Sequence, residues 1–359
     1  SLKMKVKISI ISCLILLFSL TACKQTDDDI LIRGKLNGKY GFMDKSGKIV
    51  VNPQFDYADA FSEGLARIEL NGKYGFIDKS GEFVVYPQFD YIDEDPFSEG
   101  LARIGLNGKY GFIDKSEEIV INPQFDDADS FHEGLATIKL NGKYGFIDKS
   151  GKFVVYPQFD DAWFFHEGLA TIKINGKWGF IDKSGKFVVY PQFDDAWFFH
   201  EGLAKIKLNG KWGFIDKSGE FVVYPQFDYA DSFSEGLAII GLNGKYGFID
   251  KSGKIVVNPQ FDDADSFSEG LARIELNGKY GFIDKSGKIV VNPQFDWADV
   301  LFSEGLGRIE LNGKYGFIDK SGEFVVYPQF DYIDKDPLSE GLAKIKLNGK
   351  WGFIDKSGE

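Results

Sequence analysis

Residues 64–90 read GLARIELNGKYGFIDKSGEFVVYPQFD, and versions of this stretch recur along the chain. Apolar and polar residues alternate on both sides of Asn71-Gly72, which is a strong signal for a two-residue type I′ β-hairpin. Lys79-Ser80-Gly81 suits a three-residue turn in which the glycine takes the left-handed conformation. One copy therefore predicts three antiparallel strands, with a short fourth segment, such as residues 57–61, that pairs or only connects.

The hairpin motif Asn-Gly-Lys-Tyr/Trp-Gly-Phe marks an internal repeat. It begins at Asn37, Asn71, Asn107, Asn141, Asn175, Asn209, Asn243, Asn277, Asn312 and Asn348, at intervals of 34 to 36 residues. Tandem units of this size stack on their neighbours to bury a common core. No helical 3.6-residue periodicity follows residue 29. The sequence predicts an all-β fold of tandem repeats, each an antiparallel meander of three to four strands.

The register set by the Asn71-Gly72 turn predicts which side chains share a face. Ile68 lies opposite Gly75 on one face, and Arg67 lies opposite Phe76 on the other. We expect Phe83 and Val85 to join the face of Ile68. Both faces are apolar at their centres, so we expect the units to stack, with the rings of one unit against a Gly/Ala shelf of the next.

A column of aromatic residues occupies the middle strand of every unit. We interpret it as packing between units, with a sugar-stacking ladder as the alternative. Its members are Tyr40, Tyr74, Tyr110, Tyr144, Trp178, Trp212, Tyr246, Tyr280, Tyr315 and Trp351.

Composition excludes several classes of function. The 359 residues carry 42 Lys+Arg against 54 Asp+Glu, a net charge of −12, whereas nucleic-acid binding needs clustered basic residues. Three His and two Cys supply few ligands for zinc or haem and few nucleophile–base pairs. We expect no cofactor and no nucleic-acid partner.

The N-terminus predicts export and lipid anchoring. Residues 1–22 fit a signal peptide, with a possible leader at 1–3, basic Lys5 and Lys7, and an apolar run over 8–20 that is too short to span a bilayer. Residues 20–23 read LTAC, which resembles a bacterial lipobox with Cys23 as the lipidated residue. Residues 23–29 then form the lipidated Cys and a tether, and residues 30–359 form one domain of ten repeats, the last incomplete. The alternative is an ordinary secretory signal with a chance cysteine.

The repeats resemble the bacterial WG-repeat (KWG) family. The likeness is closest where Gly-Lys-Trp-Gly-Phe occurs, at 176–180, 210–214 and 349–353, and Tyr replaces the Trp elsewhere. The resemblance implies propeller-like blades in an exported or surface-associated protein, and no activity is established for the family in general. Ten units exceed the usual four to eight blades of a propeller, so a closed ring and an open superhelix both remain possible.

Three groups of residues are candidates for a site. Trp163, Trp197 and Trp297 stand in connecting segments, where aromatic residues often mark contact surfaces. His132, His166 and His200 recur at a position that is Ser in the other units, so we interpret them as loop residues rather than a metal ladder. The acidic cluster Asp126, Asp127, Asp129 and Glu133 is a weak calcium candidate, because its spacing matches no standard calcium loop.

These observations favour a non-enzymatic, membrane-anchored lipoprotein of the bacterial cell envelope or surface that binds a protein or glycan partner. One alternative is a glycan-active enzyme that uses paired carboxylates, such as Asp93 with Glu94 or Asp334 with Asp336. The other is a structural envelope spacer without a ligand.

Overall fold

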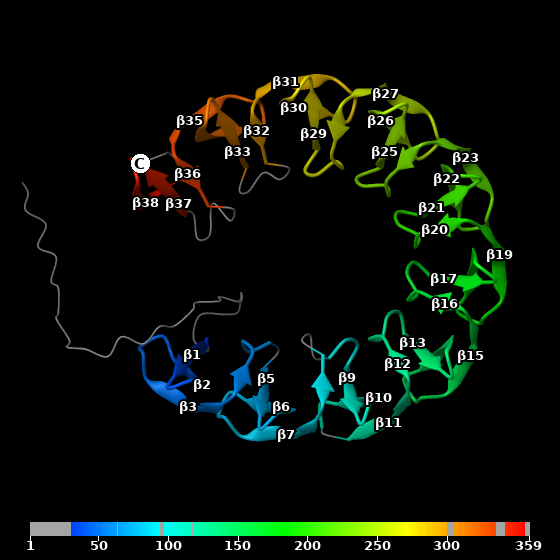
Figure 1. Ribbon diagram of the computed structural model, residues 1–359, viewed down its shortest axis with the longest axis vertical. Coiled ribbons are helices and arrows are strands. Elements are labelled where there is room, and N and C mark those ends of the chain that lie inside the picture. The colour runs from blue at the N-terminus through cyan, green and yellow to red at the C-terminus, as the bar shows by residue number, and fades with distance from the viewer. Residues whose placement is uncertain are drawn as a thin grey trace, which may run out of the picture. The chain divides into compact units, whose positions relative to one another are not determined.

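The computed structural model describes residues 30–62, 64–93, 97–116, 118–299, 305–334 and 342–355, and every regular element within them is a β-strand (Figure 1). The all-β prediction is therefore confirmed. None of these residues belongs to a helix long and apolar enough to cross a membrane. The predicted signal peptide, Cys23 and its tether, Glu94 and Asp336 lie outside the described residues.

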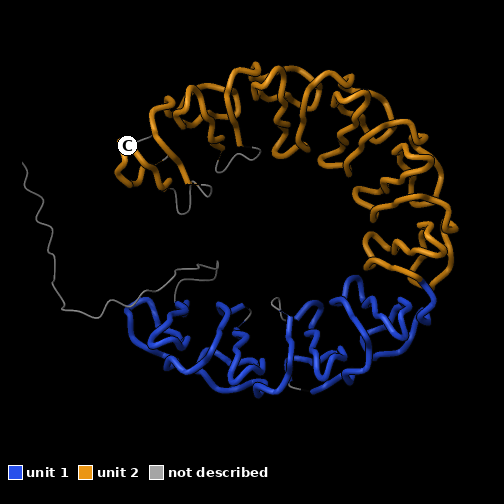
Figure 2. The backbone as a smooth tube through the Cα atoms, viewed as in Figure 1, with its two compact units in different colours: residues 1–159 blue, residues 160–359 orange. Residues whose placement is uncertain are grey.

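The chain forms two compact units, Ser1–Phe159 and Asp160–Glu359 (Figure 2). Each unit repeats one antiparallel sheet, whose strands pair in the order of the sequence. A full sheet has a two-residue strand followed by three longer ones. The segment that the sequence left undecided therefore does pair, since Tyr57 lies opposite Glu69 and Ala58 opposite Ile68 of the following strand.

The short strands that open the sheets are β4 (Tyr57–Ala58), β8 (Tyr91–Ile92), β12 (Asp127–Ala128), β16 (Asp161–Ala162), β20 (Asp195–Ala196), β24 (Tyr229–Ala230), β28 (Asp263–Ala264), β32 (Trp297–Ala298) and β36 (Tyr332–Ile333). The first long strands are β1 (Ile32–Leu36), β5 (Leu65–Leu70), β9 (Leu101–Leu106), β13 (Leu135–Leu140), β17 (Leu169–Ile174), β21 (Leu203–Leu208), β25 (Leu237–Leu242), β29 (Leu271–Leu276), β33 (Leu306–Leu311) and β37 (Leu342–Leu347).

The middle strands are β2 (Lys39–Met43), β6 (Lys73–Asp78), β10 (Lys109–Asp114), β14 (Lys143–Asp148), β18 (Lys177–Asp182), β22 (Lys211–Asp216), β26 (Lys245–Asp250), β30 (Lys279–Asp284), β34 (Lys314–Asp319) and β38 (Lys350–Asp355). The last strands are β3 (Ile49–Phe55), β7 (Phe83–Phe89), β11 (Ile119–Phe125), β15 (Phe153–Phe159), β19 (Phe187–Phe193), β23 (Phe221–Phe227), β27 (Ile255–Phe261), β31 (Ile289–Phe295) and β35 (Phe324–Phe330).

Both predicted turns are present. Asn71 and Gly72 have φ angles of 54° and 74°, as a type I′ turn requires, and Gly81 has a φ of 87°. Before the second turn, Asp78 accepts hydrogen bonds from the Ser80 hydroxyl at 2.6 Å and the Ser80 backbone N–H at 2.8 Å. The hydrogen bond from the Ser80 hydroxyl is the main cause that lowers the pKa of Asp78. This carboxylate therefore fixes the turn.

The register of the first hairpin is as predicted, but that of the last strand is not. Ile68 lies opposite Gly75 and Arg67 opposite Phe76. Val85, however, lies opposite Phe76 and so shares the face of that ring rather than the face of Ile68. The prediction for Val85 was wrong because the last strand is interrupted by two register shifts, and a single shift moves a side chain to the other face.

The second register shift explains the glycine that follows every column aromatic. In β18 and β19, Trp178 lies opposite Phe193 and Phe180 opposite Val189, so three residues of β19 pass the single residue Gly179. A Cβ atom on Gly179 would lie 2.5 Å from the Val189 carbonyl oxygen. Only glycine allows the bulged backbone to come this close.

Within a compact unit, neighbouring sheets share hydrophobic clusters. Phe180 is fully buried in a cluster with Ala204, Ile206 and Ile215 of the next sheet. The expected contact of rings with an alanine shelf is therefore confirmed. The expectation that glycine would form part of this shelf was wrong, because the backbone of its own sheet covers Gly179.

Polar contacts also link successive sheets. Glu201 occupies a tight turn with a φ of 52°, and its carboxylate accepts a hydrogen bond from the Gly236 N–H and pairs with Lys251 Nζ, both at 2.9 Å. Both partners belong to the next sheet. An equivalent hydrogen bond from Lys285 is the main cause that lowers the pKa of Glu235. These clamps offset the cost of a left-handed non-glycine residue, which is of order 1 kcal/mol.

The glycine requirement can be tested within one motif. Gly179→Ala is expected to lower the free energy of unfolding by about 2 kcal/mol, since its new methyl group meets backbone that cannot move aside. Gly352→Ala is the matched control, because a Cβ there would meet only the Ile345 side chain at 3.7 Å. Urea unfolding of both variants makes the comparison, and equal losses would contradict the explanation.

Candidate functional site

Trp163 and Trp197 take the place of an ion pair found in other sheets. In those sheets the residue after the short strand is an aspartate, as in Asp265, which accepts a hydrogen bond from Arg273 Nε at 2.6 Å. The facing strand carries Thr171 and Lys205 where Arg273 would stand. The two connections that follow β16 and β20 therefore carry aromatic rings in place of an Asp–Arg ion pair.

The rings of these two connections form one cluster, which we call the Trp ridge. The ring centroids of Trp163 and Trp197 are 5.5 Å apart and those of Phe164 and Phe198 5.8 Å apart. Trp163 also lies 5.7 Å from the column residue Trp178. The ridge consists of Trp163, Phe164, His166, Trp197, Phe198 and His200. Trp197 is 39% exposed and the other members are partly exposed, so the ridge is a surface feature.

A buried cation underlies the ridge. Lys205 Nζ lies 4.5 Å from the ring centroid of Trp197 and 5.0 Å from that of Trp212, and 3.7 Å from Asp231 Oδ1. Burial lowers the pKa of Lys205. The cation and the two rings hold each other in place, which fixes the orientation of Trp197.

Trp297 lies apart from the ridge, in β32 and three sheets further along the same unit. It is partly buried, and the guanidinium carbon of Arg308 lies 4.7 Å from the centroid of its ring. The structure thus brings together two of the three tryptophans that the sequence singled out.

The histidines make the same contact as the serines that replace them. His166 Nδ1 lies 2.6 Å from the Phe199 carbonyl oxygen and His200 Nδ1 2.8 Å from that of Phe233, while Ser234 donates to the Phe267 carbonyl at 2.9 Å. His166 and His200 stack nearly parallel, with centroids 6.2 Å apart. His132 belongs to the other compact unit.

The carboxylates of the acidic cluster that was a weak calcium candidate contact other groups of the protein. Asp126 pairs with Lys109 at 2.5 Å, Asp127 accepts a hydrogen bond from the Ala128 N–H at 2.9 Å, and Asp129 lies 3.9 Å from Arg103 Nη1. Glu133 sits in a tight turn with a φ of 52°. Over the described ranges, no three His, Cys, Asp or Glu side chains are placed to hold a metal ion together.

The carboxylate pairs named for hydrolysis are incomplete in the described chain. Asp93 accepts hydrogen bonds from the Tyr91 hydroxyl at 2.6 Å, Arg103 Nη2 at 2.7 Å and the Ser130 hydroxyl at 2.8 Å. It is a linking residue between sheets, since Ser130 belongs to the next one. Its partner Glu94 lies outside the described residues, as does Asp336, the partner of Asp334.

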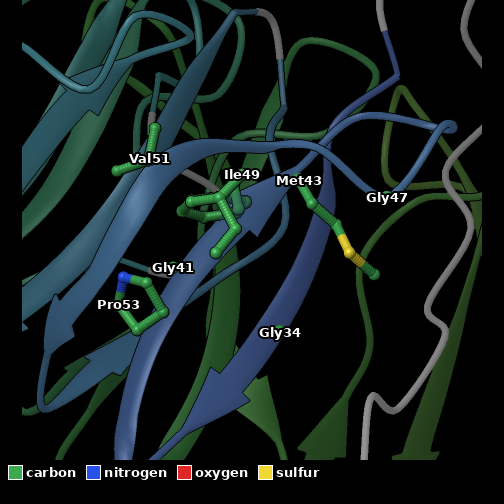
Figure 3. Close-up of a pocket in the computed structure, with 8 residues that line it drawn as sticks. Gly34, Gly41, Met43, Gly47, Ile49, Val51 and Pro53 are labelled. Atoms are coloured by element: carbon green, nitrogen blue, oxygen red, sulfur yellow. The ribbon is translucent and has the colours of Figure 1, made fainter. Parts of the chain in front are cut away.

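A small apolar hollow lies on the first sheet (Figure 3). It has a volume of about 80 Å³ and is lined by Gly34, Gly41, Phe42, Met43, Gly47, Ile49, Val51 and Pro53. Gly34 aligns with Ile68, which is fully buried in the next sheet, so a missing side chain accounts for the hollow. Its lining carries no titratable group, and we assign it no chemistry.

The column aromatics contribute mainly to the core. Trp178 is 6% exposed and Tyr40, Tyr110 and Tyr246 are partly buried against the clusters between sheets, although Trp351 is 54% exposed. The sequence did not predict the clamping role of the Glu in the Ser/His-Glu-Gly-Leu turns, and it named Glu133 only as a calcium candidate. The signal was the place of this Glu before glycine in the nine copies that have the turn.

Tandem antiparallel sheets with an aromatic-Gly-Phe middle strand define a β-repeat protein of propeller-like blades. The chain belongs to the family of the WG containing repeat, whose signature matches residues 40–74, 74–110, 110–144, 144–178, 178–212, 212–246, 246–280, 280–315 and 315–351. The resemblance drawn from the sequence is therefore confirmed.

Three solved structures show distant likenesses to the chain. A eukaryotic initiation factor is 10% identical with a TM-score of 0.43, over 79% of this chain and 91% of its own. Hsv2p of Kluyveromyces lactis is 7% identical with a TM-score of 0.34, over 62% and 90%. The extracellular domain of a hybrid two-component system from B. thetaiotaomicron is 12% identical with a TM-score of 0.27, over 90% of this chain and 56% of that one. No curated protein matches the chain.

The histidines offer a test of the loop interpretation. His200→Ser is expected to change the free energy of unfolding by less than about 0.5 kcal/mol, because serine makes the same hydrogen bond in the next sheet. Ser234→Ala, which removes that bond, is the control and is expected to cost about 1 kcal/mol. Zinc should leave the Tm of the unaltered protein unchanged. A rise in Tm with zinc that His200→Ser abolishes would identify a metal site instead.

Proposed function

We propose that this protein is a non-enzymatic binding scaffold, anchored to the bacterial cell envelope, that captures a protein or glycan partner at the Trp ridge. The observation that carries the proposal is the exposed gathering of aromatic rings on two neighbouring connections, where other sheets have an Asp–Arg pair. The sheets fold with either arrangement, so the rings are not required by the repeat itself.

The surroundings of the ridge suit a recognition surface. Glu167 and Glu201 of the same two connections form ion pairs with lysines of the following sheets, Lys217 at 3.0 Å and Lys251 at 2.9 Å. Aromatic anchors bordered by polar groups are typical of binding surfaces, because the rings supply most of the affinity and the polar border excludes water. The buried Lys205 keeps Trp197 oriented before a partner arrives, which lowers the entropy cost of binding.

Replacing both ridge tryptophans tests the site. The double variant Trp163→Ala with Trp197→Ala is expected to weaken capture on an array of glycans and purified envelope proteins by about tenfold or more. Its β-sheet circular dichroism should persist, because the equivalent positions are aspartate in other sheets. Trp351→Tyr is the matched control, since Trp351 lies outside the ridge and tyrosine fills this column position in most units.

Two outcomes would contradict this proposal. Loss of the β-sheet signal in the double variant would make the rings core residues. An array without any hit would favour a structural spacer.

The anchoring part of the proposal rests on the sequence around Cys23. Cys23→Ser should move the protein from the detergent phase to the aqueous phase in cloud-point partitioning and abolish labelling with a radioactive fatty acid, because acyl chains supply the membrane affinity at about 0.8 kcal/mol per buried CH₂. Cys13→Ser is the control within the signal peptide and should leave both readouts unchanged. Persistent detergent partitioning of the Cys23→Ser protein would overturn lipid anchoring at this residue.

A further inference from the structure

The most exposed aromatic rings of the described chain are not in the Trp ridge. Apart from Phe353 in β38, which is 66% exposed, they are tyrosines of the last strands, which are 66% to 72% exposed: Tyr86, Tyr156, Tyr190, Tyr224 and Tyr327. Each ring stacks on the phenylalanine three residues earlier, with centroids 4.8 to 5.1 Å apart and planes within 21° to 27° of parallel. One ring face is therefore covered and the ring is held in a fixed orientation, while most of its surface is open to solvent.

The bulge in the last strand produces this exposure. Residues 190–192 pass over Gly179, and Tyr190 points away from the sheet, whereas Val189 before it enters the core. The strand lies at the edge of its sheet, because it pairs on one side only. Figure 1 shows β19 and β23 as neighbours along the outer edge of their unit. The tyrosines are thus presented on a rigid element rather than on a loop.

Packing does not account for these tyrosines. In four of the five pairs the phenylalanine makes a ring contact with the preceding sheet, as Phe221 does with Phe193, at a centroid distance of 6.2 Å. In other units the same two positions carry an isoleucine and an asparagine, as in Ile255 with Asn258, and those sheets have the same strands. The fold therefore does not need the tyrosine ring.

Tyr190 and Tyr224 belong to adjacent sheets of one compact unit, and their surroundings indicate the kind of ligand. Gln192 and Gln226, two residues further on, are exposed and offer amide donors and acceptors. A flat ring with an electron-rich face suits the C–H face of a pyranose, whose hydroxyl groups suit the amides. In its own strand each exposed tyrosine is accompanied by the phenylalanine on which it stacks and by an exposed glutamine, which is unlike the contiguous apolar core of a protein interface.

Charge decides between kinds of polysaccharide. The residue before each strand is Lys186 in one sheet and Glu220 in the other, so the two sites together carry no excess of positive charge. The whole chain has a net charge of −12. A polyanion would be repelled, whereas an uncharged polymer meets no electrostatic cost.

We propose that Tyr190 and Tyr224 form a binding surface for an uncharged polysaccharide, with one sugar face on each tyrosine ring. The surface is separate from the Trp ridge and uses none of its residues. Because the two rings can engage one polymer chain, long chains should bind more tightly than short oligosaccharides of the same sugar. The other stacked pairs, Tyr86 with Phe83, Tyr156 with Phe153 and Tyr327 with Phe324, each present one further exposed ring of the same kind.

Affinity electrophoresis tests the proposal. The gels contain mixed-linkage β-glucan, xyloglucan, dextran or glycol chitin as uncharged polymers, and alginate as a polyanion. At least one uncharged polymer is expected to retard the protein, and alginate is not. The double variant Tyr190→Asn with Tyr224→Asn, which installs the asparagine of the other units, should bind about tenfold more weakly or worse, with an unchanged Tm. Asn258→Ala with Asn292→Ala is the matched control at the same strand position and should migrate like the unaltered protein.

A second measurement needs no variant. The retarding polymer should protect Tyr190 and Tyr224 from nitration by tetranitromethane, as read by mass spectrometry of the peptides. The proposal is overturned if no uncharged polymer retards the protein, if only alginate does, or if the double variant is retarded like the unaltered protein. Absence of protection from nitration would also overturn it. So would a concentration-dependent dimer that the double variant abolishes, because a second copy of the chain would then occupy the surface.

Discussion

The burial of one phenylalanine per sheet against the next sheet is the contact on which this structure depends. Phe180 is representative: it is fully buried and packs against Ala204 and Ile206 of its neighbour. Since each sheet is apolar on both faces, a sheet by itself would expose both faces to water, at a cost of about 25 cal/mol per Å² of apolar surface. The free energy of unfolding therefore depends on contacts between adjacent copies. Hydrophobic burial stabilises these contacts, and polar clamps such as Glu201 with Gly236 fix how one sheet is oriented on the next.

Variation between copies falls where this contact does not constrain it. The connection after the short strand carries Asp265 paired with Arg273 in one sheet and Trp197 over Lys205 in another. The last strand likewise carries a tyrosine in some sheets and an asparagine in others at its fourth residue, as in Tyr190 and Asn258. A rigid repeat can thus display different chemistry on two edges without changing its core. This separation of scaffold and surface is why binding is the function that the site supports best.

Much of the fold followed from the sequence because turn chemistry is local. Asn71-Gly72 and Asp78 form turns that depend on a few neighbouring residues. The register of the first hairpin was therefore predicted correctly from the sequence. The site was predicted in part: Trp163 and Trp197 do come together, Trp297 does not join them, and the exposed tyrosines were not singled out. Val85 was assigned to the wrong face, because a bulge is decided by backbone contacts that no alternation pattern records.

The sequence by itself determined the repeat, its strands, its turns and the need to stack, because periodicity and turn residues act over a few positions. Only the tertiary structure decided that the backbone crosses Gly179 closely, that Glu201 clamps the next sheet, and which rings are exposed. Those outcomes depend on distances between residues that are 10 to 50 positions apart. Aromatic residues look alike in a sequence whether they are buried or exposed, and only neighbouring sheets determine which face of a ring meets water.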